Sequence, residues 1–449
     1  MTGPSTDLET AAVLRRSRPA PPVRIVHLGL GAFSRSHTAW YTGRAADAED
    51  WGIAAYTGRS AGLAAALTAQ DGVYTLVERS ADGDRHEVVE SIVRAHPGDD
   101  VASLLADIAA PATAVVTLSI TEAGYRTGAD GLPDGGDPLV RSDRRLLAQL
   151  AGGDSEAAFG LQTVLGRLVA GLDARRRAGA GPLAVVSCDN IPDNGGHVAR
   201  ALLALAASVP RTADWCRLNV SFVSGSVDRI TPRIEADELS RLSERYGDAV
   251  PVVAEPFSDW VLSGAFPAGR PAWETAGARF TDELEPWEAR KLWLLNGAHT
   301  ILACLGPLRG HSLVSEAIGD PVCRTAVERF WDDAERNLPV QLDIGLYRHA
   351  LLERFANPRI AHLLSQIASD TATKIRLRIV PVAELERAAG RSAEGCAGAL
   401  AAWLVSLDQP DGVACLRDLI AGVSASLAAD EDFITSVALS VPGIRAAFL

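Results

Sequence analysis

An apolar segment that runs directly into a glycine turn sets the strongest limit on how this chain folds. Residues 23–29, V-R-I-V-H-L-G, are typical of a short buried strand because β-branched residues dominate and a glycine ends the run. The chain continues through G-L-G-A-F-S at residues 29–34, and a helical pattern follows over residues 35–46. A strand, a glycine turn and a helix in this order open a βαβ unit. We therefore expect a parallel sheet.

The alternation of strands and helices continues over the first 281 residues. A second helix is predicted at residues 61–69, and the glycine-rich residues 127–137 are predicted as a surface loop. Residues 1–22 hold scattered arginines and prolines and are predicted as a flexible leader. We expect an α/β domain over residues 23–281, with further strands at residues 51–58, 114–120, 183–187 and 220–223.

Helical patterns dominate after residue 282, and they predict a mostly α-helical domain over residues 282–449. One predicted helix start is well marked, because Asp320 can cap the helix and Pro321 suits its first position. The predicted helices cover residues 286–304, 321–337, 341–355, 360–369, 383–407 and 413–428.

Composition and charge exclude several classes of protein. The 43 Lys and Arg residues against 56 Asp and Glu residues give a net charge of −13, which argues against nucleic acid as the partner. The six cysteines have no metal-ligand spacing, which fits reduced thiols in the cytoplasm. The sequence shows neither a secretory signal nor an apolar run of about 18 residues, so we expect no membrane partner. We expect a monomer that acts on a small molecule.

The glycine turn itself suggests a dinucleotide site. In such a turn the first glycine makes the bend and the second lets a pyrophosphate approach the backbone, and Gly29 and Gly31 fit these positions. Ala32 and Phe33 complete the candidate cofactor-binding turn, and Ser34 replaces the usual third glycine. The fold class predicted is an α/β Rossmann-type N-terminal domain plus a mostly α-helical C-terminal domain.

The end of the second predicted strand bears on the choice between NAD and NADP. NAD-specific sites usually carry an acid there to hold the ribose, whereas Y-T-G-R-S at residues 56–60 has none. Arg59 either accepts the 2′-phosphate of NADP or is a solvated loop arginine. The sequence leaves these two interpretations open.

A predicted helix over residues 287–305 is apolar nearly all round from Leu292 onward, yet it carries Lys291, Asn296 and His299. At about 100° per residue, these three and Glu288 fall within a sector of roughly 140°. Polar groups on a buried face cost free energy unless they are partnered or line a cavity. The alternative is a lysine that reaches solvent beside a hydrogen-bonded core histidine. Three such groups beside a candidate cofactor site favour catalysis.

These side chains suit alcohol oxidation without a metal. A desolvated lysine can take the hydroxyl proton while hydride leaves the carbinol carbon for a nicotinamide, and amide N–H groups can stabilise the alkoxide. A second candidate set, Asp189, Asn190 and Asn194, follows the predicted strand at residues 183–187, although asparagine-rich turns are often only turns. A third set, Asp228 and Arg229, either binds hydroxyl groups or forms an internal ion pair.

With these motifs in hand, the chain resembles the polyol-specific long-chain dehydrogenase/reductase family over about residues 23–381. The K-x4-N-x-x-H pattern of that family falls on Lys291, Asn296 and His299. The other matching segments lie in the same order along the chain. They are G-L-G-A-F-S-R-S-H (29–37), Q-D-G-V-Y-T-L-V-E-R (70–79), T-L-S-I-T-E-A-G-Y (117–125), S-C-D-N-I-P-D-N-G (187–195), V-D-R-I-T-P (227–232), E-P-F-S-D-W (255–260), R-F-A-N-P-R-I (354–360) and residues 370–381.

The resemblance implies roles for particular residues. It implies that Lys291 is the general acid/base, that His299 positions it and the substrate, and that Asn190 and Asn296 stabilise the alkoxide. It also implies a substrate contact at Asp228, a proton-relaying Glu288, and an active site without zinc that lies between the two domains.

The activity implied is the interconversion of a sugar alcohol and a ketose with NAD or NADP, as between mannitol and fructose. The alternative is a hexonate substrate, as in fructuronate reductase (D-mannonate oxidoreductase), with Lys374, Arg376 and Arg378 as candidates to hold its carboxylate. A non-catalytic nucleotide-binding sensor is a third interpretation. It is disfavoured because the lysine and its neighbours are all present.

Overall fold

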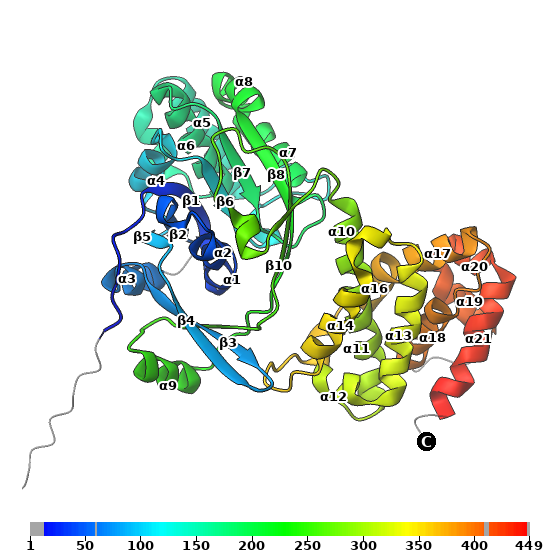
Figure 1. Cartoon of the computed structure of the whole chain (residues 1–449). Helices are drawn as coiled ribbons and strands as arrows, with labels where there is room; N and C mark the ends of the chain where they lie inside the picture. Colours follow the sequence, from blue (N-terminus) through cyan, green and yellow to red (C-terminus); the bar gives the residue numbers. More distant parts are fainter. Residues whose placement is uncertain (1–12, 59–60, 408–412, 447–449) are drawn as a thin grey trace, which may run out of the picture. The chain divides into compact units, whose positions relative to one another are not determined.

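The computed structural model describes residues 13–58, 61–407 and 413–446, which form two compact units (Figure 1). The first unit contains the described residues up to Leu284, except Ser80–Asp82. The second contains Ser80–Asp82 and the described residues from Glu285 onward. The sequence places the division at residues 281/282, and the structure places it at residues 284/285.

The first unit is built on an eight-stranded sheet in the order β11-β10-β8-β7-β6-β1-β2-β5. Pairing from β8 through to β5 is parallel, and β10 lies antiparallel to β8. Since β1 lies between β2 and β6, the order of the strands reverses there, and ligands of such sheets bind at the carboxyl ends beside that point. The strands are β1 (Val23–Leu30), β2 (Gly52–Thr57), β5 (Ile92–His96), β6 (Val115–Leu118), β7 (Leu183–Ser187), β8 (Val220–Asp228), β10 (Asp259–Ser263) and β11 (Arg279–Phe280).

Both faces of this sheet are covered, as expected for a Rossmann-type fold. Neighbouring residues of β1, Ile25 and Val26, are fully buried and belong to different hydrophobic clusters. Helices α4, α6 and α7 contribute to the cluster of Val26, and α2 and α3 to that of Ile25. The α-helices of this unit are α1 (Ala32–Ser36), α2 (Thr38–Arg44), α3 (Ala61–Ala69), α4 (Val101–Ala109), α5 (Pro138–Ala151), α6 (Val164–Ala178), α7 (Asn194–Ala206), α8 (Pro210–Asn219) and α9 (Ala236–Tyr246).

The structure of this unit differs from the local predictions in two places. The single helix predicted over residues 35–46 is divided at His37, whose ring is buried among Phe33, Tyr41 and Trp260 at 4.9–5.1 Å. The unit also contains a three-stranded sheet that was not predicted, in the order β4-β3-β9, formed by β3 (Tyr74–Ser80), β4 (Gly83–Val89) and β9 (Val252–Ala254).

The described part of the predicted leader, residues 13–22, is held against the first unit. The backbone N–H of Leu14 donates to the carbonyl of Gly247 at 2.8 Å. The guanidinium of Arg16 donates to the carbonyls of Glu90 and Ile92 at 2.6 and 2.5 Å. These long-range bonds correct the prediction of a flexible leader for residues 13–22, and residues 1–12 lie outside the described ranges.

The second unit is mostly helical, as predicted. The cap predicted for α13 is confirmed, because the Asp320 side chain accepts from the N–H of Val322 and Pro321 is the first helical residue. Its helices are α10 (Glu285–Arg290), a π-helix (Lys291–Gly297), α11 (Ala298–Leu308), α12 (Val314–Gly319), α13 (Pro321–Glu335), α14 (Ile344–Phe355), α15 (Leu364–Ile367), α16 (Thr371–Arg378), α17 (Val380–Ala388), α18 (Glu394–Ser406), α19 (Val413–Ala421), α20 (Ala425–Ala429) and α21 (Glu431–Ala446).

Two long helices predicted in this unit are each divided. The helix predicted over residues 383–407 is interrupted between α17 and α18, where Gly390 and Ala393 have φ values of +72° and +57°. The helix predicted over residues 413–428 is interrupted before α20, which Ser424 caps. No helix in the described ranges has the length and apolar character needed to cross a membrane.

His27 on β1 gives the first unit a pH-dependent stability. Its Nδ1 lies 2.8 Å from the hydroxyl of Thr117, and burial lowers its pKa to about 4. The unfolded chain, with an ordinary histidine pKa near 6.5, binds the proton more tightly. The contribution of neutral His27 to the free energy of unfolding is therefore fully present above about pH 6.5 and is lost as the pH falls towards 4.

The free energy of unfolding of the wild type should fall between pH 7.5 and pH 5. We expect this fall to be about 2 kcal/mol smaller in His27→Gln. Urea unfolding followed by tryptophan fluorescence measures the loss at each pH. His349→Gln, at a histidine whose side chain is 74% exposed, is the control and should leave the loss unchanged. An identical pH dependence in wild type and His27→Gln would contradict the prediction.

Candidate active site

The turn after β1 is shaped by Gly29. Its φ is +102°, and a Cβ placed on it would lie 2.0 Å from the carbonyl oxygen of Ser119. Only glycine therefore lets β1 and the segment after β6 approach this closely. At Gly31 the nearest heavy atom to such a Cβ is 3.7 Å away, an ordinary van der Waals distance, so no neighbouring atom would obstruct a Cβ there.

The serine that replaces the usual third glycine bonds back to this turn. The hydroxyl of Ser34 accepts the backbone N–H of Gly31 at 3.0 Å. Of the two other residues predicted for the cofactor, Ala32 is exposed beside the turn, whereas Phe33 is half-buried and stacks on His37. The side chain of Phe33 therefore packs within the protein.

A cavity of about 470 Å³ opens at the carboxyl ends of β1, β2 and β6. Gly29 and Leu30 line it from β1, and Thr57 and Gly58 line it at the end of β2. Its described lining includes two arginines, Arg126 and Arg167, and no Asp or Glu. An opening at the reversal point of the strand order, lined by backbone and cations, fits a ligand with a pyrophosphate. Arg59 lies outside the described residues.

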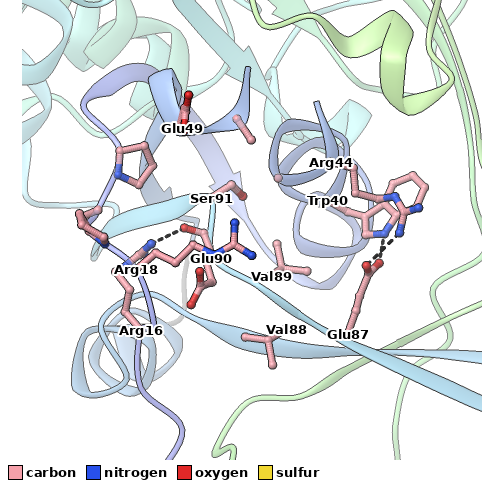
Figure 2. A pocket seen from close by; sticks show the side chains of 15 residues that line it. Arg16, Arg18, Trp40, Arg44, Glu49, Glu87, Val88, Val89, Glu90 and Ser91 are labelled. Carbon is pink, nitrogen blue, oxygen red and sulfur yellow. Dashed lines mark hydrogen bonds and ion pairs between the residues drawn. The ribbon is translucent and has the colours of Figure 1, made fainter. Parts of the chain in front are cut away.

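A second cavity, of about 370 Å³, lies against residues 16–21, α2 and the end of β4 (Figure 2). Figure 2 shows that Glu87 binds the indole N–H of Trp40 and, at 2.9 Å, the guanidinium of Arg44. Glu90 accepts the backbone N–H and hydroxyl of Ser17. Glu87 thus joins β4 to α2, and Glu90 holds the N-terminal segment, so we assign both carboxylates a structural role.

The turn after β7 carries three of the predicted residues. One is exposed to solvent, and the other two are buried and form hydrogen bonds within the protein. Asn190 is exposed. Asp189 is buried, and its carboxylate accepts hydrogen bonds from Ile120, Tyr125 and Ser187.

Asn194 is buried and uses its amide within the protein. Its Nδ2 donates to the carbonyls of Asp189 and Gly225, and its Oδ1 accepts the N–H of Gly225. We therefore assign Asn194 to holding the turn after β7 and leave it out of the proposed substrate contacts.

Asp228 is the last residue of β8 and Arg229 follows it, and the two side chains do not have a common role. The Arg229 side chain is fully buried and pairs with Glu78 at 2.5 Å. It also donates to the carbonyls of Ser36 and Glu255 and lies over the ring of Trp40. Its cation is used within the fold, so we leave it out of the proposed substrate contacts. Asp228 ends β8, and its backbone pairs with that of Asp259 on β10.

The segment predicted as one α-helix around Lys291 contains a π-helix over Lys291–Gly297. Residues of a π-helix advance by less than 100° each, so the projection that grouped Lys291 with Asn296 does not apply there. Side chains bond the carbonyls of this wider turn. Trp331 donates to the carbonyl of Leu294 at 2.8 Å, and Arg378 donates to that of Asn296 at 3.1 Å. Single-turn π-helices are frequent at functional sites.

His299 lies one turn beyond Asn296 and is buried. Its ring packs against those of Phe355 and His362, each at 4.8 Å. Burial lowers its pKa well below 6.5, and the neighbouring His362, Arg354 and Arg378 act in the same direction. His299 is therefore neutral at pH 7, and its Nε2 has no hydrogen-bond partner within the described part of the chain.

The remaining predicted residues lie in the same unit. Glu288 is half-buried on α10, three residues before Lys291. Lys374 donates from its Nζ to the carbonyls of Ile367 and Ser369 at 2.7 and 2.6 Å. These bonds tie α16 to the segment before it, so Lys374 is used locally. Among the residues that the structure describes, no group of three or more His, Cys, Asp or Glu is arranged to hold a metal ion.

Comparison with known proteins gives consistent matches across the chain. The family model described as the mannitol dehydrogenase Rossmann domain matches residues 23–275, and that of the mannitol dehydrogenase C-terminal domain matches residues 283–418. D-mannonate oxidoreductase of Escherichia coli is 34% identical over 85% of this chain and 79% of its own length. D-arabinitol 4-dehydrogenase of Ralstonia nicotianae is 38% identical over 82% of this chain and 79% of its own length.

Two solved structures are also similar. A D-sorbitol dehydrogenase in substrate-free form has a TM-score of 0.86, 27% identity, and coverage of 97% of this chain and 99% of its own. The mannitol 2-dehydrogenase of Pseudomonas fluorescens, in a ternary complex with NAD and D-mannitol, has a TM-score of 0.73 and 32% identity. That match covers 95% of this chain and 93% of the Pseudomonas chain.

A Rossmann-type unit with a glycine turn, joined to a helical unit that carries polar groups on a π-helix, defines a two-domain oxidoreductase. Both family models match in order and together cover more than half of the chain. The chain belongs to the mannitol dehydrogenase family.

Proposed function

We propose that the chain is a metal-independent, NAD(P)-dependent oxidoreductase that interconverts a sugar alcohol and a ketose. The observation that carries this proposal is the helical segment on which Lys291 begins a π-helix, Asn296 lies within it, and a neutral, buried His299 follows. The six free cysteines are consistent with a reducing compartment such as the cytoplasm.

The proposed mechanism assigns one task to each group. Lys291 takes the proton of the substrate hydroxyl as hydride leaves the carbinol carbon, and it returns the proton in the reverse direction. Asn190 and Asn296 donate N–H groups to the developing alkoxide. His299 is neutral, so its ring can donate or accept a hydrogen bond and orient lysine and substrate. Asp228 contacts a substrate hydroxyl, and Glu288 passes protons to solvent.

The groups suited to hold the cofactor belong to the first unit. The bend at Gly29, the open backbone at Gly31, and the cavity lined by Arg126 and Arg167 fit a dinucleotide pyrophosphate. The nicotinamide cofactor, when bound, supplies the hydride acceptor or donor. The Pseudomonas relative whose structure holds NAD and D-mannitol supports this assignment.

A hexonate is the second candidate substrate, and one observation favours it. Arg354 and Arg378 lie close enough to His299 to lower its pKa, and guanidinium groups suit a substrate carboxylate. The D-mannonate oxidoreductase of Escherichia coli is among the relatives that cover most of this chain.

Turnover of fructose and of fructuronate tests the proposal directly. Each sugar is offered with NADH, and the loss of absorbance at 340 nm is followed in the presence of a chelator. We expect faster turnover of fructose. Turnover of fructuronate alone would move the substrate to the hexonates, and loss of activity with chelator that zinc restores would contradict metal independence.

Cofactor preference tests the role of Arg59. If Arg59 contacts a 2′-phosphate, Arg59→Ala will lower kcat/KM with NADPH about tenfold or more and leave that with NADH nearly unchanged. The ratio of the two kcat/KM values is the measurement. An unchanged ratio would make Arg59 a solvated loop residue.

A further inference from the structure

Asp189 brings together two segments that belong to different parts of the proposed site. Asp189 lies two residues after the end of β7, and its buried carboxylate accepts three hydrogen bonds. The donors are the backbone N–H of Ile120 at 2.5 Å, the hydroxyl of Ser187 at 2.9 Å, and the hydroxyl of Tyr125. Ile120 and Tyr125 follow β6, so one side chain joins the ends of two neighbouring parallel strands.

The backbone of Asp189 is also held in place, by a hydrogen bond from Asn194. The carbonyl of Asp189 accepts Nδ2 of Asn194 at 2.8 Å, and Asn194 is itself bonded twice to Gly225 on β8. The turn from Asp189 to Asn194 is therefore fastened at both ends. Asn190, the exposed residue just after Asp189, takes its position from these bonds.

The segment after β6 that Asp189 holds is part of the cavity wall. Ser119, Ile120 and Thr121 all line the cavity that suits the dinucleotide. The carboxylate of Asp189 thus fixes this wall through Ile120 and fixes Asn190 through the chain itself. Since misplacement of reacting groups by about 1 Å can cost about 100-fold in rate, such a link has consequences for turnover.

The groups around Asp189 determine when it can accept all three bonds. Burial raises the pKa of Asp189 to about 6 and outweighs the hydrogen bonds, which act in the opposite direction. Burial and the neighbouring carboxylate raise the pKa of Tyr125 well above 10, so its hydroxyl remains a donor. The other titratable groups that face the pair are Cys188, on the same turn, and His197 of α7, whose ring contacts Tyr125 edge-on.

We propose that Asp189 is a positioning residue, which acts by holding Asn190 and the Ile120 wall of the cofactor cavity in one arrangement. The proposal rests on the proposed function, since the task of Asn190 belongs to that function. Turnover then requires a carboxylate at residue 189 that accepts from both strand ends.

Asp189→Asn tests the proposal with little change of shape. In the variant, an NH2 group replaces one of the two carboxylate oxygens and faces groups that are themselves hydrogen-bond donors. We therefore expect kcat to fall about 10- to 100-fold. We expect kcat of the wild type to fall below about pH 6, and this loss should be absent in Asp189→Asn. Asp173→Asn is the matched control, since Asp173 is a buried carboxylate on α6 bonded to Arg176 and Thr212. It should lower the melting temperature and keep the kcat profile.

Tyr125→Phe serves if Asp189→Asn does not fold. Removing this one donor destabilises the ionised carboxylate, so the acidic limb of the kcat profile should move to higher pH. The proposal would be wrong if the acidic limb of the kcat profile kept its wild-type pH in Tyr125→Phe, or if that limb were still present in Asp189→Asn.

Hydrogen exchange separates this proposal from the proposed function, because it needs no substrate. In the ligand-free protein, Asp189→Asn should speed exchange in residues 119–125 and 188–195 together, whereas Asp173→Asn should leave both segments unchanged. Faster exchange in one segment alone would show that Asp189 does not couple them. If no sugar is turned over while both segments respond, the proposed function fails and the coupling stands.

Discussion

Replacing Lys291 with alanine is expected to lower kcat about 1,000-fold at pH 7.5, because the variant lacks the group that we propose as the proton acceptor of the alcohol. The chain makes this residue distinctive, since Lys291 and Lys374 are its two lysines among 43 Lys and Arg residues. Arginine stays charged at any ordinary pH, whereas lysine can give up its proton. The initial rate of NADH oxidation with the preferred sugar measures the loss.

Lys291→Arg is the matched variant, because it keeps the positive charge and the hydrogen-bond donors. We expect it to be nearly as inactive as Lys291→Ala, and a titration of NADH fluorescence should give the same affinity in both variants and the wild type. If Lys291→Arg kept more than about a tenth of the wild-type kcat, the residue would act through its charge. The general acid/base assignment would then be wrong.

The sequence was sufficient to predict the parts of the fold that depend on local pattern. Short runs of β-branched residues predict β1 and β7, and Asp320 followed by Pro321 predicts the start of α13. The order of strands, turn and helices then predicts a Rossmann-type unit. The resemblance to the polyol-specific dehydrogenase family identified Lys291, Asn296 and His299 as one group of candidate site residues.

Features that depend on distant partners were not predictable from local pattern. The π-helix at Lys291–Gly297 is accompanied by hydrogen bonds from Trp331 and Arg378, which lie far away in the sequence. Arg229 looks like one half of a pair with Asp228, yet its partner Glu78 is 151 residues away. A helical projection or a residue spacing contains no information on such contacts.

The same limit applies to the turn after β7. Its Asp and Asn residues have the composition of a binding loop and equally of an ordinary turn. The structure separates them by burial, because Asp189 and Asn194 face inward to bond β6 and β8 while Asn190 is exposed. The missed residue is Tyr125. Its hydroxyl bonds Asp189 from a position 64 residues earlier, and although Tyr125 ends the matching segment 117–125, residue spacing does not reveal this contact.

Gly29→Ala is expected to have the largest effect on the first unit. The added Cβ would lie 2.0 Å from the carbonyl oxygen of Ser119, and alanine is strained at a φ of +102°. Either the end of β1 or the segment after β6 must move, at a cost of about 3 kcal/mol or more. We expect a lower midpoint of urea unfolding and a loss of NADH binding of at least about 100-fold, because Ser119 and Gly29 both line the cavity that we propose for the cofactor.

Gly31→Ala separates the two effects. Its φ of −154° is extended backbone that alanine adopts freely, and the nearest atom to the new Cβ is 3.7 Å away. The unfolding midpoint should therefore stay at the wild-type value, while the methyl group occupies space that the pyrophosphate needs and weakens NADH binding about tenfold or more. Wild-type affinity for NADH in a well-folded Gly31→Ala would place the cofactor elsewhere. If Gly31→Ala were destabilised, the turn would be packed more tightly than the distance of 3.7 Å from the new Cβ to its nearest neighbour indicates.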